Sequence, residues 1–237
     1  MMRIPISTGL LLMVSLAVCA PAYAGSITVQ GIVFPQGAAS FADSVYCYAP
    51  VIDGSGNPSI AHRVPSNALG LPDYDDDPNC DGDPGCTFVS LGLGGSIVLK
   101  FTDNLLSASG DSSIDLWVFE VGPLVEDMDI WISQDASDPT KWLWVGGVGG
   151  STAGIDIDAN INADNPAYGY DYDIDDLFSY VLLTDYPDAI PVGGPTIGAD
   201  IDAVGAISTS LVPEPSFALL LGVGFGAVFL LKWRFSA

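Results

Sequence analysis

Carboxylate side chains are the main candidates for chemistry in this chain of 237 residues. Six of the eleven residues in 73–83 are aspartates, and so many carboxylates close together repel one another unless a cation binds. The spacing does not fit an EF-hand, because Pro78 stands sixth, where Gly is needed, and Pro84 stands twelfth, where Glu is needed. Any calcium site must therefore be assembled from separate segments. The alternative is a solvated acidic loop that binds nothing.

Two other segments place carboxylates where they need a partner. Glu120 ends the apolar face of a strand predicted over 113–121, and a buried carboxylate must find a partner or shift its pKa. Asp200 and Asp202 lie two apart on a later predicted strand, so we expect them to share a face. The predicted calcium ligands are Asp73, Glu120, Asp200 and Asp202. The alternative is that these carboxylates cap strand ends and accept backbone hydrogen bonds.

Other potentially reactive groups are few. Asp156 and Asp158 form another pair two residues apart, which the polar face of an edge strand explains equally well. His62 is the sole histidine, and its Pro-flanked position indicates an exposed loop residue. No Gly-x-Ser-x-Gly nucleophile motif accompanies it. We therefore predict a protein that is not an enzyme. A polysaccharide hydrolase that uses two carboxylates is the alternative.

The composition restricts the class of partner. The acidic residues comprise 26 Asp and three Glu, and Asp favours turns and oxygen cages for hard cations. Residues 25–211 carry three Lys or Arg against 28 Asp or Glu, a formal charge of −25. Such a surface repels nucleic acid and anionic lipid. Because 49% of the chain is hydrophobic, we expect a folded domain rather than a disordered acidic segment.

Apolar residues between the ends alternate with period two, which predicts an all-β domain over 25–211. The predicted strands cover 26–34, 94–101, 113–121, 128–133, 142–148, 178–185 and 200–208. Clusters of Gly, Pro and Asp separate them, which favours an antiparallel β-sandwich of jelly-roll type. We expect long loops over 36–90 and 149–177.

Cysteines and aromatic residues add two predictions. Cys80 and Cys86 flank a turn-forming stretch and are predicted to form a disulfide, while Cys47 bonded to either of them is the rival pairing. Tryptophans are interpreted mainly as core residues, with a ligand platform as the alternative. Residues 168–172 alternate tyrosine with Gly or Asp, which predicts an exposed platform made by Tyr168, Tyr170 and Tyr172.

Both ends of the chain have the pattern of export signals. Residues 1–24 combine a basic start, an apolar run and Ala22-Tyr23-Ala24, which predicts a signal peptide cut by signal peptidase. A lipoprotein is the alternative because of Cys19, although Val18 does not suit a lipobox. At the other end, 217–231 is predicted as a single transmembrane helix about 22 Å long, and the basic tail 232–237 places the body outside the cytoplasm.

The motif before that helix, Pro213-Glu214-Pro215, completes a C-terminal segment over 212–237 with the motif in 212–216. Motif, apolar helix and basic end in this order resemble the PEP-CTERM sorting signal. That resemblance implies recognition by an exosortase, removal of the tail and delivery to the cell surface or matrix. The alternative is that this segment is an ordinary C-terminal membrane anchor.

The body also resembles bacterial cell-surface jelly-roll domains that accompany such tails. The resemblance rests on short strings at 68–73, 89–92, 94–99, 115–120 and 198–204. It implies the fold and the location, and the strand ending in Phe119-Glu120 and the pair Asp200 and Asp202 match its recurring motifs.

Together these features predict an exported surface or extracellular-matrix protein that associates with extracellular polysaccharide or biofilm. Before tail processing, the C-terminal helix would hold it in the inner membrane with its domain in the periplasm. Ca²⁺ is the expected cofactor, and exosortase and signal peptidase are the expected partners during export. A purely structural surface-coat component is a further alternative.

Overall fold

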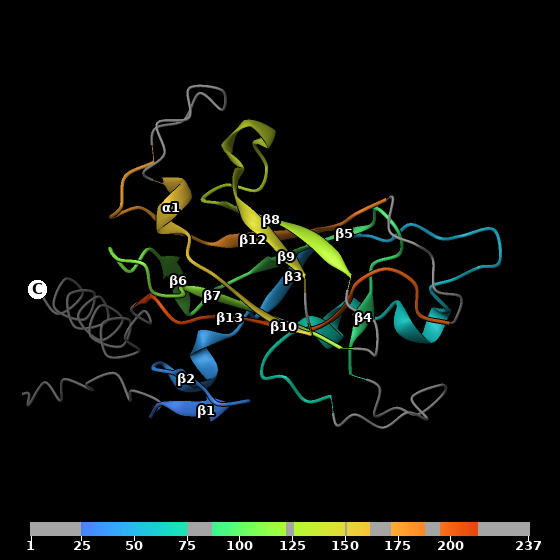
Figure 1. Ribbon diagram of the computed structural model, residues 1–237, viewed down its shortest axis with the longest axis horizontal. Coiled ribbons are helices and arrows are strands. Elements are labelled where there is room, and N and C mark those ends of the chain that lie inside the picture. The colour runs from blue at the N-terminus through green and yellow to red at the C-terminus, as the bar shows by residue number, and fades with distance from the viewer. Residues whose placement is uncertain are drawn as a thin grey trace, which may run out of the picture. The chain divides into compact units, whose positions relative to one another are not determined.

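Antiparallel strands dominate the computed structural model, as the sequence predicts (Figure 1). The structure describes residues 25–74, 87–121, 126–149, 151–161, 172–187 and 195–212. The predicted signal peptide, the sorting segment from Pro213 onward and the proposed disulfide partners Cys80 and Cys86 lie outside these ranges. Among the described residues, no helix is long and apolar enough to cross a membrane.

Two sheets enclose the main core. One has the order β3 (Ser44–Ala49), β5 (Ser96–Lys100), β12 (Tyr180–Asp185), β8 (Asp127–Ser133) and β9 (Leu143–Gly149). The other has the order β10 (Thr152–Ile155), β7 (Leu116–Glu120), β13 (Asp200–Ala206) and β4 (Val89–Ser90). Leu116 and Val118 from the second sheet belong to the same buried cluster as Leu99, Ile130 and Leu183 from the first. This packing is sandwich-like and confirms the all-β prediction.

Shorter elements complete the described part of the chain. The strands β1 (Ile27–Val29) and β2 (Ile32–Phe34) form a hairpin, and β6 (Asn104–Ser107), β11 (Leu177–Phe178) and β14 (Thr209–Leu211) form a small sheet. The helical turns are α1 (Asp158–Ile161) and 3-10 turns at Gly37–Ser40, Ile60–His62, Pro65–Ala68 and Pro139–Lys141. At the tip of the hairpin, Gln30 and Gly31 both have positive φ angles of 50° and 83°, as a tight hairpin turn requires.

Two of the predicted loops contain regular structure. The prediction of a long loop over 36–90 is wrong where β3 pairs with β5, and the loop predicted over 149–177 contains β10 and α1. Residues of β3 alternate poorly between exposed and buried because the strand lies at a sheet edge and carries a bulge between Val45 and Cys47. The predicted strand 26–34 is two strands joined by the turn described above.

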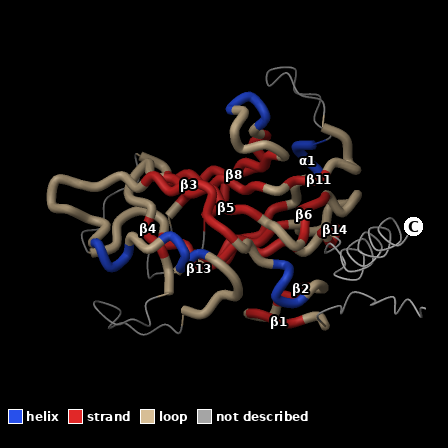
Figure 2. The backbone as a smooth tube through the Cα atoms, turned by 180° about the vertical axis from the view of Figure 1, so that it is seen from behind, coloured by secondary structure: helices blue, strands red, loops and turns tan. Residues whose placement is uncertain are grey.

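A second, smaller core lies on the other face of β7 and β13. Figure 2 shows the β1–β2 hairpin beside the four-stranded sheet. Three rings from separate elements meet there, with Phe34 at 4.6 Å from Phe41 and 6.0 Å from Phe119 between centroids. Every residue of β13 is buried because the strand is covered on both faces.

Gly205 on β13 permits this aromatic packing. A Cβ atom placed there would lie 2.7 Å from the Phe34 ring and 2.8 Å from the Phe41 ring. We expect Gly205→Ala to lower the free energy of unfolding by about 1–3 kcal/mol, because overpacking a rigid core costs that much. Urea denaturation of the full chain measures the change.

Gly54→Ala is the matched control, since no atom lies within 4 Å of an added Cβ at that loop position. We expect it to change stability by less than about 0.5 kcal/mol. Equal stability of the two variants would show that the Phe cluster tolerates the extra methyl group.

Candidate functional site

Buried carboxyl groups gather at the end of β7 where the two sheets meet. Glu120 ends β7, Asp200 begins β13, Asp185 ends β12 and Glu126 immediately precedes β8. We call these four residues the Glu120 cluster. Its members come from both sheets, because the antiparallel order brings the end of β7 and the start of β13 to the same edge.

Glu120 is almost completely shielded from water. Its side chain is 2% exposed, and neither carboxyl oxygen has a hydrogen bond of good geometry, although an interaction with the Asp200 backbone N–H partly opposes the rise in its pKa. The nearest polar partner is the carboxyl group of Glu126, and two carboxyl groups can share a hydrogen bond only when one is protonated. Burial, followed by the charges of Glu126 and Asp200, raises the pKa of Glu120 well above its ordinary value. The predicted burial of Glu120 beside Leu116 and Val118 is confirmed.

Asp200 and Asp185 are buried but hydrogen-bonded. The Ser90 hydroxyl donates to Asp200 Oδ1, and burial raises the pKa of Asp200 to about 8, with a further contribution from the charge of Glu126. Asp185 accepts from the backbone N–H groups of Gly94 at 3.0 Å and Ala199 at 3.1 Å. Burial nevertheless raises the pKa of Asp185. Both side chains are thus held in fixed orientations beside Glu120.

Asp202 pairs with Asp73 beside this cluster. Its Oδ1 accepts a hydrogen bond of 3.3 Å from the Asp73 backbone, and burial together with the Asp73 charge raises its pKa to about 7. The register of β13 against β7 shifts between Ile201 and Ala203, so Asp202 is the extra residue of a β-bulge. The bulge interrupts the alternation from which we expected Asp200 and Asp202 to share a face.

The structure therefore brings the four predicted ligands together as two separate pairs rather than as one group of four. Glu120 interacts with Asp200, and Asp73 interacts with Asp202. Sequence reasoning missed Glu126 and Asp185. Asp185 ends a predicted strand and Glu126 is the only other Glu in residues 25–211, and these were the available signals. That the four predicted residues bind metal stays a prediction.

Few positive charges oppose these carboxylates. Arg63 lies close enough to Tyr48 to lower the pKa of its hydroxyl, although burial outweighs this and raises that pKa to about 12. Tyr48 in turn donates a hydrogen bond of 2.6 Å to the Ser90 carbonyl beside Asp200. The cluster contains only oxygen ligands, which suit Ca²⁺ rather than softer metals. Among the described residues, no three side-chain oxygens of this cluster lie close enough together to share one ion, so calcium binding here stays a prediction.

His62 is not the exposed loop residue that the sequence indicated. Its side chain is 1% exposed and stacks on Phe88 with ring centroids 5.0 Å apart and planes 10° apart. The 3-10 turn at Ile60–His62 directs the imidazole inward. Its packing is that of a structural aromatic residue.

Exposed and half-buried aromatic side chains form a second feature, on the outer face of the five-stranded sheet. We call the following residues the aromatic face: Tyr46, Trp131, Trp144, Tyr180 and Tyr186. Trp131 lies directly opposite Trp144 across β8 and β9. The Trp144 side chain is 37% exposed, which departs from the interpretation of tryptophans mainly as core residues. The prediction that Tyr172 is exposed is wrong, because its ring is half-buried against Phe178 and its hydroxyl donates to the Lys141 carbonyl. The other two predicted platform residues, Tyr168 and Tyr170, lie outside the described residues.

Hydrogen bonds and ring contacts fix this face. Asp129 Oδ1 accepts from Trp144 Nε1 at 2.8 Å and from the Tyr186 hydroxyl at 2.9 Å. Tyr46 contacts Tyr180 edge-on at 5.3 Å, and Lys100 Nζ lies 5.3 Å from the centre of the Tyr180 ring. Aromatic side chains that are both exposed and held in place can bind a flat ligand with little loss of conformational freedom.

The Glu120 cluster and the neighbouring Asp202 make stability depend on pH in a specific direction. A carboxyl group whose folded pKa is raised binds more protons folded than unfolded, so stability falls as pH rises from its unfolded pKa through its folded pKa. For Asp202 and Asp200 that window runs from about 4 to about 7 and about 8. In EDTA we expect the melting temperature of the full chain to fall by about 5 °C or more between about pH 5 and pH 8. Excess CaCl₂ should restore it, most strongly at the higher pH.

Glu120→Gln is the matched variant, because glutamine keeps the size and removes the titration. Its melting temperature should depend less on pH in EDTA and gain less from calcium. The exposed groups with lowered pKa values, Asp53, Asp111, Asp135 and Asp138, contribute only below that window. A melting temperature that rises with pH in EDTA would contradict the assignment.

No protein-family model matches the chain, and no curated protein resembles it at a significant level.

Proposed function

We propose that this protein is exported and acts without catalysis at the cell surface or in the extracellular matrix, where its β-domain binds extracellular polysaccharide. Calcium bound by buried carboxylates stabilises the domain. The sandwich-like pair of antiparallel sheets supports this proposal, and the assignment to the jelly-roll type is part of it.

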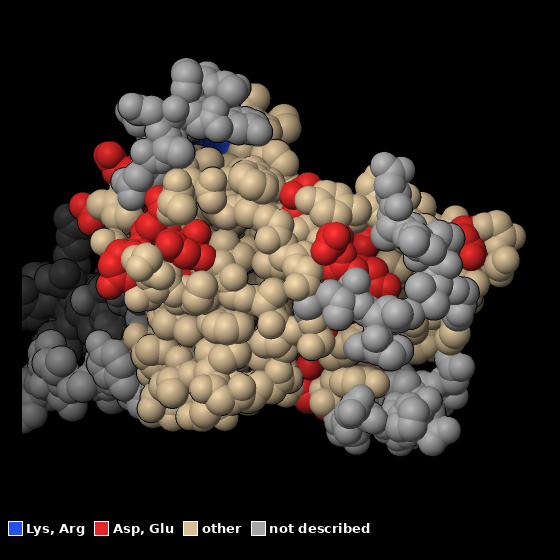
Figure 3. Space-filling model, viewed as in Figure 1, with Lys and Arg blue, Asp and Glu red and all other residues tan. Residues whose placement is uncertain are grey.

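The aromatic face is the observation that carries the binding part. A pyranose ring has apolar C–H faces that pack on aromatic rings, and its hydroxyl groups need polar partners at the rim. Trp144, Tyr186 and Asp129 offer that combination, since two rings are oriented by one carboxylate. Figure 3 shows acidic side chains in several places on one face of the molecule and only a small area of Lys and Arg. This charge favours a neutral or calcium-bridged glycan over a polyanion bound directly.

The carboxylate-hydrolase alternative has little support. A general acid with a raised pKa, such as Glu120, is what a glycosidase needs, but its side chain is 2% exposed and offers no room for a sugar ring. A purely structural coat component shares the same fold and differs only in lacking a glycan ligand.

The export and sorting part rests on the resemblance of residues 212–237 to PEP-CTERM signals and on the signal-peptide pattern of 1–24. In this proposal, signal peptidase removes the first segment, and an exosortase recognises Pro213-Glu214-Pro215 and removes the tail. The domain passes through the periplasm and reaches the surface. The membrane holds the chain through 217–231 only until processing.

Glycan binding is tested with the full chain in mild detergent by pull-down on cellulose, chitin and alginate, and by a glycan array, each in calcium and in EDTA. We expect binding in calcium and weaker binding in EDTA. Trp144→Ala should weaken it about tenfold, since removing an aromatic contact costs on the order of 1–2 kcal/mol.

Ile60→Ala is the control, because Ile60 is the most exposed of the large apolar residues of the described chain and belongs to no strand of the five-stranded sheet. Its binding should equal that of the wild type. If no glycan binds in calcium, or if Trp144→Ala binds as the wild type does, the polysaccharide part is wrong.

Sorting is tested in a host that expresses an exosortase. Replacing Pro213, Glu214 and Pro215 by alanine should leave an unprocessed chain in the inner membrane, while the wild type is shortened and reaches the surface. Ser210→Ala, an exposed position upstream of residues 212–216, serves as the control. Immunoblots of membrane, surface and medium fractions measure the outcome, and identical processing of the triple variant and the wild type would exclude exosortase recognition.

A further inference from the structure

A compact group of carboxylates lies at the other end of β7 from Glu120. Asp115 immediately precedes β7, Asp156 follows β10 and Asp158 begins α1. Since Leu116 pairs with Ile155, antiparallel pairing brings Asp115 and Asp156 to the same edge of the sheet. The five residue steps from Asp115 to Glu120 span about 17 Å of strand, so the two groups of carboxylates are separate.

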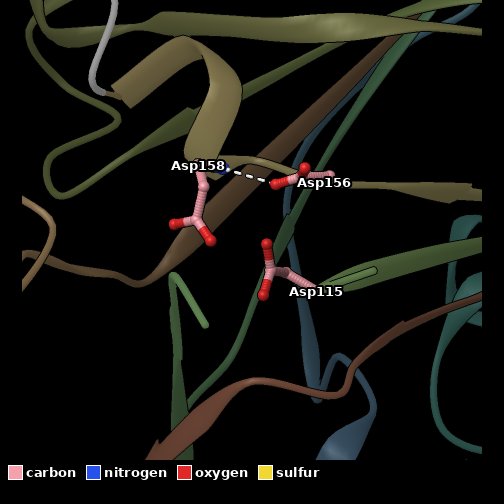
Figure 4. Close-up of side chains that lie close together, drawn as sticks. All are labelled: Asp115, Asp156 and Asp158. Atoms are coloured by element: carbon pink, nitrogen blue, oxygen red, sulfur yellow. Dashed lines mark hydrogen bonds between the residues drawn. The ribbon is translucent and has the colours of Figure 1, made fainter. Parts of the chain in front are cut away.

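The geometry of this Asp115 triad suits one small cation. One carboxylate oxygen from each residue lies within 4.8 Å of those from the other two, and it is the only such group among the described His, Cys, Asp and Glu side chains. Calcium–oxygen distances of about 2.3–2.6 Å allow two ligands of one ion to be at most about 5 Å apart. Figure 4 shows the Asp115 and Asp158 carboxyl groups facing a common space with Asp156 beside them.

Hydrogen bonds hold each carboxylate in place by one oxygen. Asp115 Oδ2 accepts from the Ile157 backbone at 3.0 Å, and Asp156 Oδ1 accepts from the Asp158 backbone at 3.0 Å. Asp158 Oδ2 accepts from the Ser109 hydroxyl and from the Gly110 backbone, both at 2.9 Å. The positions of the three groups are therefore set by the fold, and binding an ion would require little rearrangement.

An unsatisfied buried oxygen points to a ligand. Asp115 is fully buried, and although the Ser208 and Ser109 hydroxyls interact with its carboxyl group, its Oδ1 has no hydrogen bond of good geometry. Leaving a buried charged oxygen without a partner is costly, and a cation would satisfy it. Burial raises the pKa of Asp115, and the charge of Asp158 raises it further, while hydrogen bonds from Ser208, Ile157 and Ser109 partly oppose the rise.

We propose that Asp115, Asp156 and Asp158 bind a divalent cation, Ca²⁺ by preference, at a site separate from the Glu120 cluster. Three carboxylates and no nitrogen or sulfur ligand favour a hard cation, and Ca²⁺ tolerates irregular geometry better than Mg²⁺. The ion would join the start of β7, the turn from β10 into α1 and the turn at Ser109-Gly110. It stabilises that end of the sandwich and takes no part in glycan contact.

The test uses the full chain in mild detergent, stripped with EDTA and dialysed, and titrated calorimetrically with CaCl₂ and with MgCl₂. Asp156→Asn is the decisive variant, because Asp156 is only half-buried and asparagine preserves the acceptor of the turn while removing the charge. We expect it to bind one calcium ion fewer than the wild type, or to bind that ion at least tenfold more weakly. Asp115→Asn should behave alike.

Asp175→Asn removes an exposed carboxylate that is not part of the triad and should match the wild type. Glu120→Gln should still bind the calcium ion that Asp156→Asn loses, so the experiment distinguishes the Asp115 triad from the Glu120 cluster. If Asp115→Asn does not fold, the calcium titration of Asp156→Asn still tests the proposal. Equal calcium stoichiometry and affinity in Asp156→Asn, Asp175→Asn and the wild type would overturn the proposal, as would a wild type that binds no calcium.

Discussion

Charge imbalance is the constraint on which the rest of this structure depends. The body buries several carboxyl groups while its residues 25–211 contain three Lys or Arg. A buried carboxylate without a cationic partner is stable only when protonated, strongly hydrogen-bonded or bound to a metal ion. Asp185 is stabilised by hydrogen bonds, because it accepts two from backbone N–H groups. Glu120 has no hydrogen bond of good geometry and must therefore be protonated or bound to a metal ion.

The central strands explain why the charges lie where they do. Both β7 and β13 are covered on both faces, so most of their residues are apolar and their carboxylates lie at or near the strand ends. Antiparallel pairing then brings the end of each strand to the start of its neighbour. Carboxylates distant in sequence therefore meet at both edges of the four-stranded sheet, with Glu120 and Asp200 at one edge and Asp115 and Asp156 at the other.

Period-two alternation predicts the strands whose one face is buried, which is why β8 and β12 match the predicted segments closely. It fails for β3, because an edge strand with a bulge alternates irregularly. The same signal places Glu120 in the core, since it shares the parity of Leu116 and Val118. A bulge has no clear signature in sequence, so the different environments of Asp200 and Asp202 could not be predicted.

The triad was beyond sequence reasoning for a different reason. Asp156 and Asp158 are visible as a pair, but Asp115 joins them only through the pairing of β7 with β10. The segment that contains β10 had the composition of a loop, with glycine and threonine rather than large β-branched residues. Without that strand, no spacing in the sequence links residue 115 to residue 156.

The sole histidine is packed inside against Phe88. In most proteins imidazole accounts for the protons exchanged near neutrality. Here the groups with pKa values of about 7 and about 8 are aspartates at the start of β13. As the pH rises through this range, these two buried groups lose protons, so the interior gains negative charge where a histidine-rich protein would lose positive charge.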